Sequence, residues 1–200
     1  MMKLKKFSVV GRTIYFILFC LIVFSLTLSA SLLDVYKSGK IKLVPDPNFG
    51  KGTEWDIYFP QGVGDITFLS DGSFFATGSG HCVYKFDKSG KFLKKIGRKG
   101  RGPGDLYGPG DLSILDNKYL LVAEYATARR ISVFDLNGNF VKVIKTKEDV
   151  YDVVGLKNNR FVILTRSFSS EDKNTTTANN KILLYDFKTL NSRVIKKNII

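Results

Sequence analysis

The sequence contains one histidine and two cysteines in 200 residues. A single histidine, His81, leaves too few imidazoles for the multi-histidine sites that hold catalytic metals. Cys20 and Cys82 are too few for a disulfide framework, and we interpret Cys82 as a small buried apolar residue. The sequence also has no Gly-x-Ser-x-Gly elbow and no Walker-type phosphate loop. We therefore predict no catalytic residue, no metal and no cofactor.

Acidic residues are also scarce, with 18 Asp and Glu against 31 Lys and Arg, which gives a formal net charge of +13. This balance favours acidic partners such as nucleic acid, anionic lipid headgroups or acidic glycans. Four of the basic residues, Lys3, Lys5, Lys6 and Arg12, precede an apolar run and belong to targeting. Removing them leaves 13 − 4 = +9 on the rest of the chain, and lysines on solvated strand faces account for much of it.

The one long apolar run extends from Ile14 to about Leu33 and contains no charged residue. It is long enough to span a bilayer as a helix, while Ser29 and Ser31 offer a weak cleavage site for a signal peptidase. We therefore predict that residues 1–33 form a signal peptide or a signal anchor, and both alternatives stay open. The preceding basic residues hold the N-terminus in the cytoplasm. The rest of the chain is expected to be periplasmic, secreted or anchored to the membrane.

A strand-and-turn cassette dominates the rest of the chain. Its copies open at Asp65, Asp111 and Asp152, at intervals of 111 − 65 = 46 and 152 − 111 = 41 residues. A second motif repeats within the cassette, since Phe86–Phe92 matches Phe134–Phe140. A period near this length with four short strands per unit is typical of a β-propeller blade. The predicted fold class is therefore all-β, built from four-stranded antiparallel blades.

Alternating apolar and polar residues, with Asp-Gly, Ser-Gly and Asn-Gly turns, divide each unit into four strands. The predicted strands are Ile66–Leu69, Ser73–Thr77, Val83–Asp87, Phe92–Ile96, Leu112–Leu115, Tyr119–Glu124, Ile131–Asp135, Phe140–Ile144, Val153–Leu156, Phe161–Arg166, Ile182–Asp186 and Arg193–Lys196. The polar stretch from Ser167 to Asn180 is predicted to be a long mobile loop. Residues 34–48 are predicted as a linker with a partial blade, and residues 49–200 as about three blades.

Glu124 and Arg130 bracket the turn between the second and third strands of the second unit, and Gly102-Pro103-Gly104-Asp105-Leu106 lies in the connector before it. The acid–arginine pattern resembles the NHL repeat, and the connector is similar to that of bacterial six-bladed, NHL-like propeller proteins of the cell envelope. The first unit departs from the pattern, with Thr77 and Cys82 in place of the pair, and the third carries an insertion there. The resemblance implies an incomplete six-bladed NHL-like β-propeller.

Closed propellers have about four to eight blades, so three blades cannot close a ring. We therefore expect a truncated chain, or self-association through the open edge of the last blade.

Two groups of residues are candidates for function. The candidate anion or partner surface consists of Arg98, Lys99, Arg101, Arg129 and Arg130. The second group is the three aspartates that open the innermost strands, Asp65, Asp111 and Asp152. They are expected either to line the mouth of the channel as paired carboxylates or to accept hydrogen bonds from backbone amides.

We predict a non-enzymatic binding module of the cell envelope, which binds an unknown protein or glycan at the cell surface. The membrane is a further partner if the N-terminal segment is not cleaved. A propeller hydrolase or lyase is the first alternative, although the single histidine disfavours it. A basic nucleic-acid-binding NHL-type propeller is the second alternative, which the charge favours and the export signal disfavours.

Overall fold

The computed structural model describes residues 37, 46–78, 80–125, 128–170 and 176–197. The chain divides into two units, Met1–Asp46 and Pro47–Ile200. The predicted signal segment, residues 1–33, and most of the predicted linker, residues 34–48, lie outside the described residues. Within the described residues, no helix has the length and apolar character that a membrane crossing requires. The described part of the second unit contains twelve strands and one short helix.

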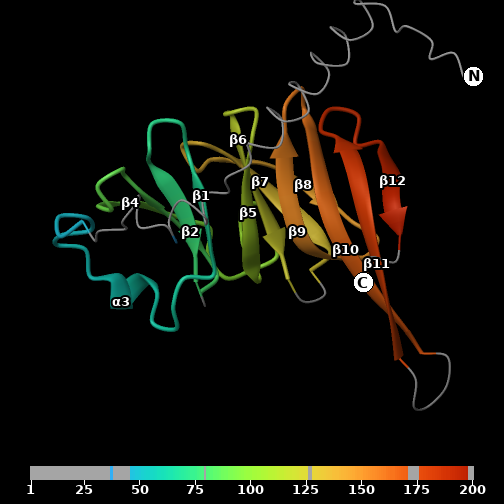
Figure 1. Ribbon diagram of the computed structural model, residues 1–200, viewed down its shortest axis with the longest axis horizontal. Coiled ribbons are helices and arrows are strands. Elements are labelled where there is room, and N and C mark those ends of the chain that lie inside the picture. The colour runs from blue at the N-terminus through green and yellow to red at the C-terminus, as the bar shows by residue number, and fades with distance from the viewer. Residues whose placement is uncertain (1–36, 38–45, 79, 126–127, 171–175, 198–200) are drawn as a thin grey trace, which may run out of the picture. The chain divides into compact units, whose positions relative to one another are not determined.

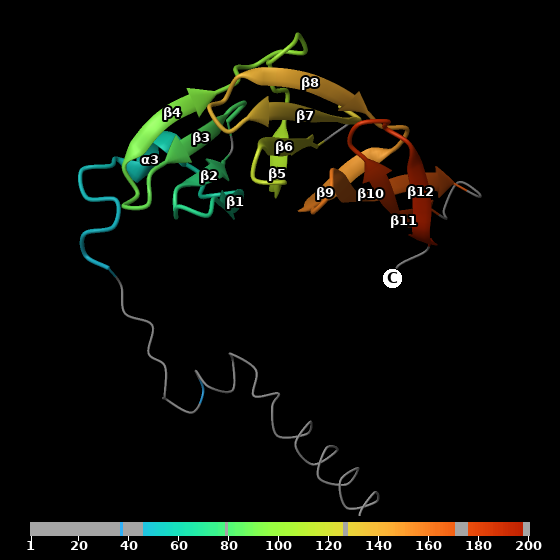
Figure 2. The same cartoon turned by 90° about the horizontal axis from the view of Figure 1, so that it is seen from above.

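The strands of the second unit form three four-stranded antiparallel sheets, in each of which the strands pair in chain order (Figure 1). The first sheet contains β1 (Asp65–Phe68), β2 (Phe74–Thr77), β3 (Val83–Phe86) and β4 (Phe92–Ile96). The second contains β5 (Pro109–Leu115), β6 (Tyr119–Glu124), β7 (Arg130–Asp135) and β8 (Phe140–Lys145). The third contains β9 (Asp149–Leu156), β10 (Arg160–Ser170), β11 (Thr176–Asp186) and β12 (Ser192–Lys197). Figure 2 shows the sheets along an arc, with β1, β5 and β9 on its concave side. The predicted blade pattern is confirmed.

Hydrogen bonds to the side chain of an aspartate stabilise the turn between the third and fourth strands in the first two sheets. The carboxylates of Asp87 and Asp135 each accept hydrogen bonds from two backbone amides of their own turn, at 2.8–3.0 Å. Gly90 and Gly138 follow in these turns with φ of 81° and 82°, a conformation that glycine adopts without the steric penalty of a side chain. The repeated Phe-Asp-x-x-Gly motif therefore encodes the hairpin between the third and fourth strands.

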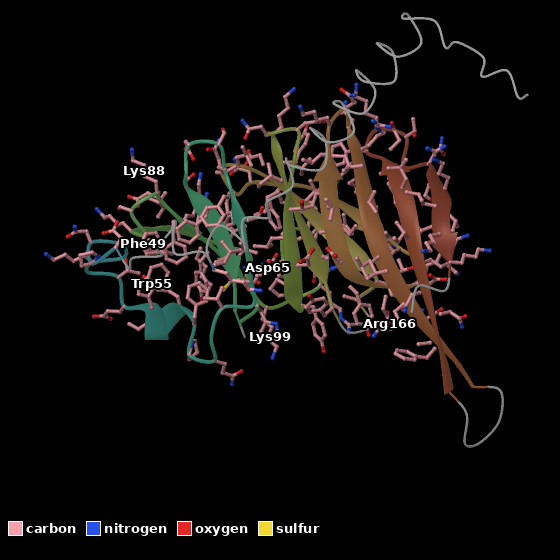
Figure 3. All side chains as sticks on the ribbon, in the orientation of Figure 1. Phe49, Trp55, Asp65, Lys88, Lys99 and Arg166 are labelled. Atoms are coloured by element: carbon pink, nitrogen blue, oxygen red, sulfur yellow. The ribbon has the colours of Figure 1, made fainter. Side chains whose placement is uncertain are left out.

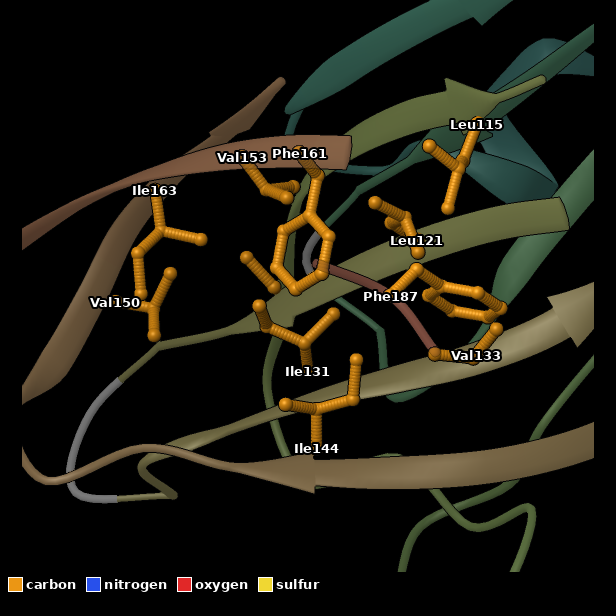
Figure 4. Packing of buried hydrophobic residues seen from close by; sticks show 11 residues of the cluster. Leu115, Leu121, Ile131, Val133, Ile144, Val150, Val153, Phe161, Ile163 and Phe187 are labelled. Carbon is orange, nitrogen blue, oxygen red and sulfur yellow. The ribbon is translucent and has the colours of Figure 1, made fainter. Parts of the chain in front are cut away.

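Apolar side chains fill the spaces between neighbouring sheets. The cluster between the second and third sheets is shown in Figure 4 and contains Leu115, Leu121, Ala123, Ile131, Val133, Ile144, Val150, Val153, Phe161, Ile163 and Phe187. A second cluster, which includes Leu120 and Val122, lies between the first and second sheets. Because successive side chains of a strand point to opposite faces, β6 contributes to both clusters in alternation. The middle sheet is thus buried on both faces.

The short helix α3 (Trp55–Tyr58) packs against the first sheet. Trp55 stacks on Phe86 with ring centroids 4.9 Å apart, and Tyr58 stacks on Phe92 at 4.7 Å. Sequence patterns predicted no helix here, because four residues are too few to show helical periodicity. Residues 46–49, the described end of the predicted partial blade and its junction with the first blade, contain a turn and no strand.

The prediction of a long loop from Ser167 to Asn180 is wrong. β10 and β11 continue through most of it, with Ser167 paired to Asn179 and Phe168 to Ala178 (Figure 1). Only residues 171–175 of this stretch lie outside the described residues. Polar composition suggested a loop, but two polar strands satisfy their backbone groups by pairing with each other.

Candidate functional site

Aspartates on the innermost strands link neighbouring sheets. Asp65 Oδ2 accepts a hydrogen bond from the backbone amide of Leu112 at 2.7 Å, and Asp111 Oδ2 accepts one from Val153 at 2.8 Å. Each carboxylate thus bonds to the first strand of the next sheet. The interpretation of these residues as acceptors for backbone amides is confirmed for Asp65 and Asp111, although the amides come from the neighbouring sheet.

Asp111 is the carboxyl most affected by this arrangement. Burial raises its pKa to about 8, and the hydrogen bond and negative charge of Asp152 act in the same direction, as does the charge of Asp65. The amide of Val153 opposes the shift. With a pKa of about 8, the Asp111 carboxyl is still largely protonated at neutral pH.

This shift predicts a pH-dependent stability. An aspartate in the unfolded chain has a pKa of about 3.9, so between about pH 4 and the folded pKa of about 8 the native state binds more protons. The contribution of Asp111 to stability is therefore full below pH 4 and is lost as the pH rises to 8. Asp111→Asn keeps an acceptor oxygen but does not titrate. Urea unfolding at several pH values should show the unmodified chain losing stability relative to this variant over that range. Parallel pH profiles would contradict the assignment.

A buried ion pair fixes the connector that leads into the second sheet. Arg130 Nε lies 2.7 Å from Glu124 Oε1, and their side chains are 11% and 0% exposed. The other guanidinium nitrogens donate to backbone carbonyls of residues 100–105. Glu124 in turn accepts hydrogen bonds from the amide of Tyr107 at 2.8 Å and the hydroxyl of Ser132 at 2.6 Å. The pair brackets the turn as the resemblance implies, and it ties strand ends to the connector.

In the third sheet, an ion pair between different residues also joins the strands to the connector that precedes them. Lys181 precedes Tyr185 by four positions, as Arg130 precedes Phe134, and it pairs in register with Thr165. The acid comes from the connector, since Glu148 forms an ion pair with Lys181 and accepts a hydrogen bond from Thr165 Oγ1 at 2.7 Å. The sequence did not indicate this pair, because the acid had moved from the strand to the connector.

A hollow of about 570 Å³ opens where the connector, the β6–β7 turn and β8 meet, and we call it the connector hollow. Three residues of the candidate surface line it: Arg101, Arg129 and Arg130. Arg101 and Arg129 are exposed, and Lys145 at the end of β8 is a third exposed cation of the lining. Sequence patterns did not single out Lys145, because its place beside Arg101 depends on the packing of β8 near the connector.

The five residues of the candidate surface differ in the partners that their charged groups have within the protein. Arg130 is buried, and all its guanidinium nitrogens are hydrogen-bonded within the protein. Arg129 forms an ion pair with Asp149 at 3.1 Å, but its side chain stays 56% exposed. The Arg101 guanidinium lies 4.7 Å from the centroid of the Tyr107 ring.

The remaining two candidates, Arg98 and Lys99, are exposed on the connector and do not line the connector hollow. Arg98 pairs with Asp105 at 2.8 Å, and the hydrogen bond from Arg98 lowers the pKa of that carboxyl.

The single histidine lies near the connector, where its Nδ1 hydrogen-bonds with the carbonyl of Tyr107. Cys82 is a free thiol with 3% of its surface exposed. Among the described residues, no three His, Cys, Asp or Glu side chains are grouped so that they could hold a metal.

A family model described as a 6-bladed beta-propeller matches residues 61–198, which is more than half of the chain. The chain belongs to this family of six-bladed β-propellers. The three described sheets are therefore blades, and α3 packs against the first of them. No curated protein matches the chain.

Several crystal structures of propellers and related proteins are similar to the chain. A protein of unknown function from Bacteroides caccae is 12% identical over 68% of this chain and 46% of that one, with a TM-score of 0.42. The β-propeller domain of Myceliophteria thermophila Cps50 (Swd1) is 12% identical over 68% and 55%, with a TM-score of 0.41. The RRP9 WD40 repeats are 13% identical over 66% and 50%, with a TM-score of 0.37. The chain spans about half of the length of these structures.

Proposed function

We propose that this propeller is a non-enzymatic binding module of the cell envelope, exported by its N-terminal segment, and that the connector hollow binds carboxylate or phosphate groups of its ligand. The observation that carries the proposal is the convergence of three exposed cations from three separate segments. Arg101 comes from the connector, Arg129 from the β6–β7 turn and Lys145 from β8. Cations that line one concavity attract an anion more strongly than the same charges spread over a flat surface.

The contacts of these cations leave them able to bind a ligand. The Arg129–Asp149 pair is exposed, and an exposed ion pair contributes about 1 kcal/mol or less, so a ligand anion can compete with Asp149. Arg130 is paired with the buried carboxylate of Glu124 and keeps its structural hydrogen bonds, so the exposed cations supply the net charge of the hollow. The hollow therefore offers charge and concavity, which suit binding. The resemblance to NHL repeats and the predicted self-association stay predictions.

Export is tested by a fusion at residue 200. A reporter that is active only in the cytoplasm should give no signal, whereas one active only outside it should give a strong signal. The reverse pattern would contradict placement in the envelope, whatever the hollow binds.

Anion binding is tested by calorimetry of the full chain in mild detergent, with digalacturonate as the probe. The double variant Arg101→Ser with Arg129→Ser should lower the affinity about tenfold, since each exposed contact contributes up to about 1 kcal/mol. The matched control is Lys88→Ser, an exposed cation that Figure 3 shows at the other end of the strands from Lys99. Equal affinities for all three proteins would contradict the proposed site.

A further inference from the structure

A second hollow of about 430 Å³ lies one blade further along the chain. Like the connector hollow, it is lined by a connector, here residues 146–148, and by the third and fourth strands of a blade, and Thr165 of the second strand adds to its lining. Val194 of β12 lines it and pairs with Leu183, as Val143 of β8 lines the connector hollow and pairs with Ser132. The hollow is thus a repeated feature of the blades.

The two hollows adjoin each other, because Lys145 and Thr146 line both. Lys147, which is exposed, extends the cationic lining into the second hollow. Four exposed cations therefore follow one path over two blades: Arg101, Arg129, Lys145 and Lys147. We call this path the basic track.

Negative charge along the basic track is neutralised. Glu148 is the one acidic residue among the described residues that line either hollow, and it forms an ion pair with Lys181 and a hydrogen bond with Thr165. Asp149, beside the track, is paired with Arg129, so these two charges cancel and the excess positive charge comes from Arg101, Lys145 and Lys147. The net field over the track is positive, so a ligand with several anionic groups gains from each of them.

We propose that the basic track binds a linear acidic polysaccharide, whose successive carboxylates contact the arginines and lysines of both hollows. This inference rests on the proposed function and adds the class of ligand and its length. A chain that occupies both hollows binds more tightly than a short one, because its second contact is intramolecular.

The remaining lining suits a polysaccharide. Each hollow contains one partly exposed aromatic ring, Phe140 in the connector hollow and Tyr185 in the second. Such rings accept the apolar C–H face of a sugar. Hydroxyls of Thr146 and Ser192 lie in the lining of the second hollow. Thr146 Oγ1 donates to the carbonyl of Glu148 at 2.9 Å, so it can accept a hydrogen bond from a sugar hydroxyl, whereas the Ser192 hydroxyl can donate and accept.

The test compares digalacturonate with octagalacturonate by calorimetry of the full chain in mild detergent. The octamer is expected to bind about tenfold more tightly than the dimer, or more. Lys147→Ser, a change at an exposed side chain, should lower the affinity for the octamer about three- to fivefold and leave that for the dimer nearly unchanged. Lys88→Ser carries the same change of charge and should alter neither value.

Three outcomes would overturn the inference, and each is distinguishable. Equal affinities for dimer and octamer would remove the continuous track while leaving anion binding in the connector hollow intact. Equal or tighter binding of octa-aspartate or of a single-stranded DNA octamer would exclude the polysaccharide as the preferred class. No binding of either galacturonate, or binding that Arg101→Ser with Arg129→Ser leaves unchanged, would reject the proposed function together with the track.

Discussion

Replacing Arg130 with alanine is expected to lower the free energy of unfolding by about 3–5 kcal/mol. The Glu124 side chain is fully buried, so the variant leaves a carboxylate without its cation in a site that excludes water. The connector also loses the donors that bind its carbonyls between residues 100 and 105. Urea unfolding of the full chain measures the effect, with fluorescence of Trp55, the single tryptophan, as the signal.

The neighbouring arginine supplies the matched control. Arg129→Ala removes an ion pair whose arginine is 56% exposed, and the expected loss is below about 1 kcal/mol. Adding Glu124→Gln to Arg130→Ala should recover part of the lost stability, because the uncompensated buried charge disappears. Similar losses for Arg129→Ala and Arg130→Ala would mean that the pair does not anchor the connector.

Replacing Phe161 with alanine is expected to cost about 3–5 kcal/mol, the range for removing a buried aromatic ring. Phe161 is fully buried in the cluster between the second and third blades (Figure 4), and its ring stacks on Tyr185 with centroids 5.1 Å apart. The variant leaves a cavity at the interface on which the packing of these two blades depends.

Phe168 provides the control, since it lies in the same strand, β10, but is 60% exposed. Phe168→Ala should change the free energy of unfolding by less than about 0.5 kcal/mol. Comparable effects of the two substitutions in the same urea experiment would contradict the described core.

The blade pattern could be predicted because local chemistry encodes it. β4 and β6 have the bounds that alternation and turn residues indicated, since Asp87 and Gly90 mark the hairpin before β4, and Asp116 and Asn117 mark the one before β6. Helix α3 could not be predicted, because its single turn is stabilised by aromatic contacts with the first blade. The extension of β10 and β11 into residues 167–180 was missed because this stretch is polar and lacks the alternation of apolar and polar residues that indicates a strand.

The candidate site was only partly predictable, for a related reason. Glu124 and Arg130 lie within one hairpin, so their pairing could be inferred from sequence. Two other features depend on contacts between segments far apart in the chain. The guanidinium of Arg130 is occupied by hydrogen bonds to the connector, and Lys145 takes its place as an exposed cation of the hollow. Tertiary packing decides which charged side chains stay exposed at a binding surface, and the amino-acid composition does not reveal that packing.

Hydrogen exchange of the full chain, with and without octagalacturonate, tests the central claim most directly. We predict slower exchange on binding in residues 98–103, 128–130 and 143–148, the segments that line or adjoin the basic track. Exchange in the turns at the other end of the strands, residues 70–73 and 87–91, should stay unchanged. Protection confined to those turns, or no protection anywhere, would contradict the account.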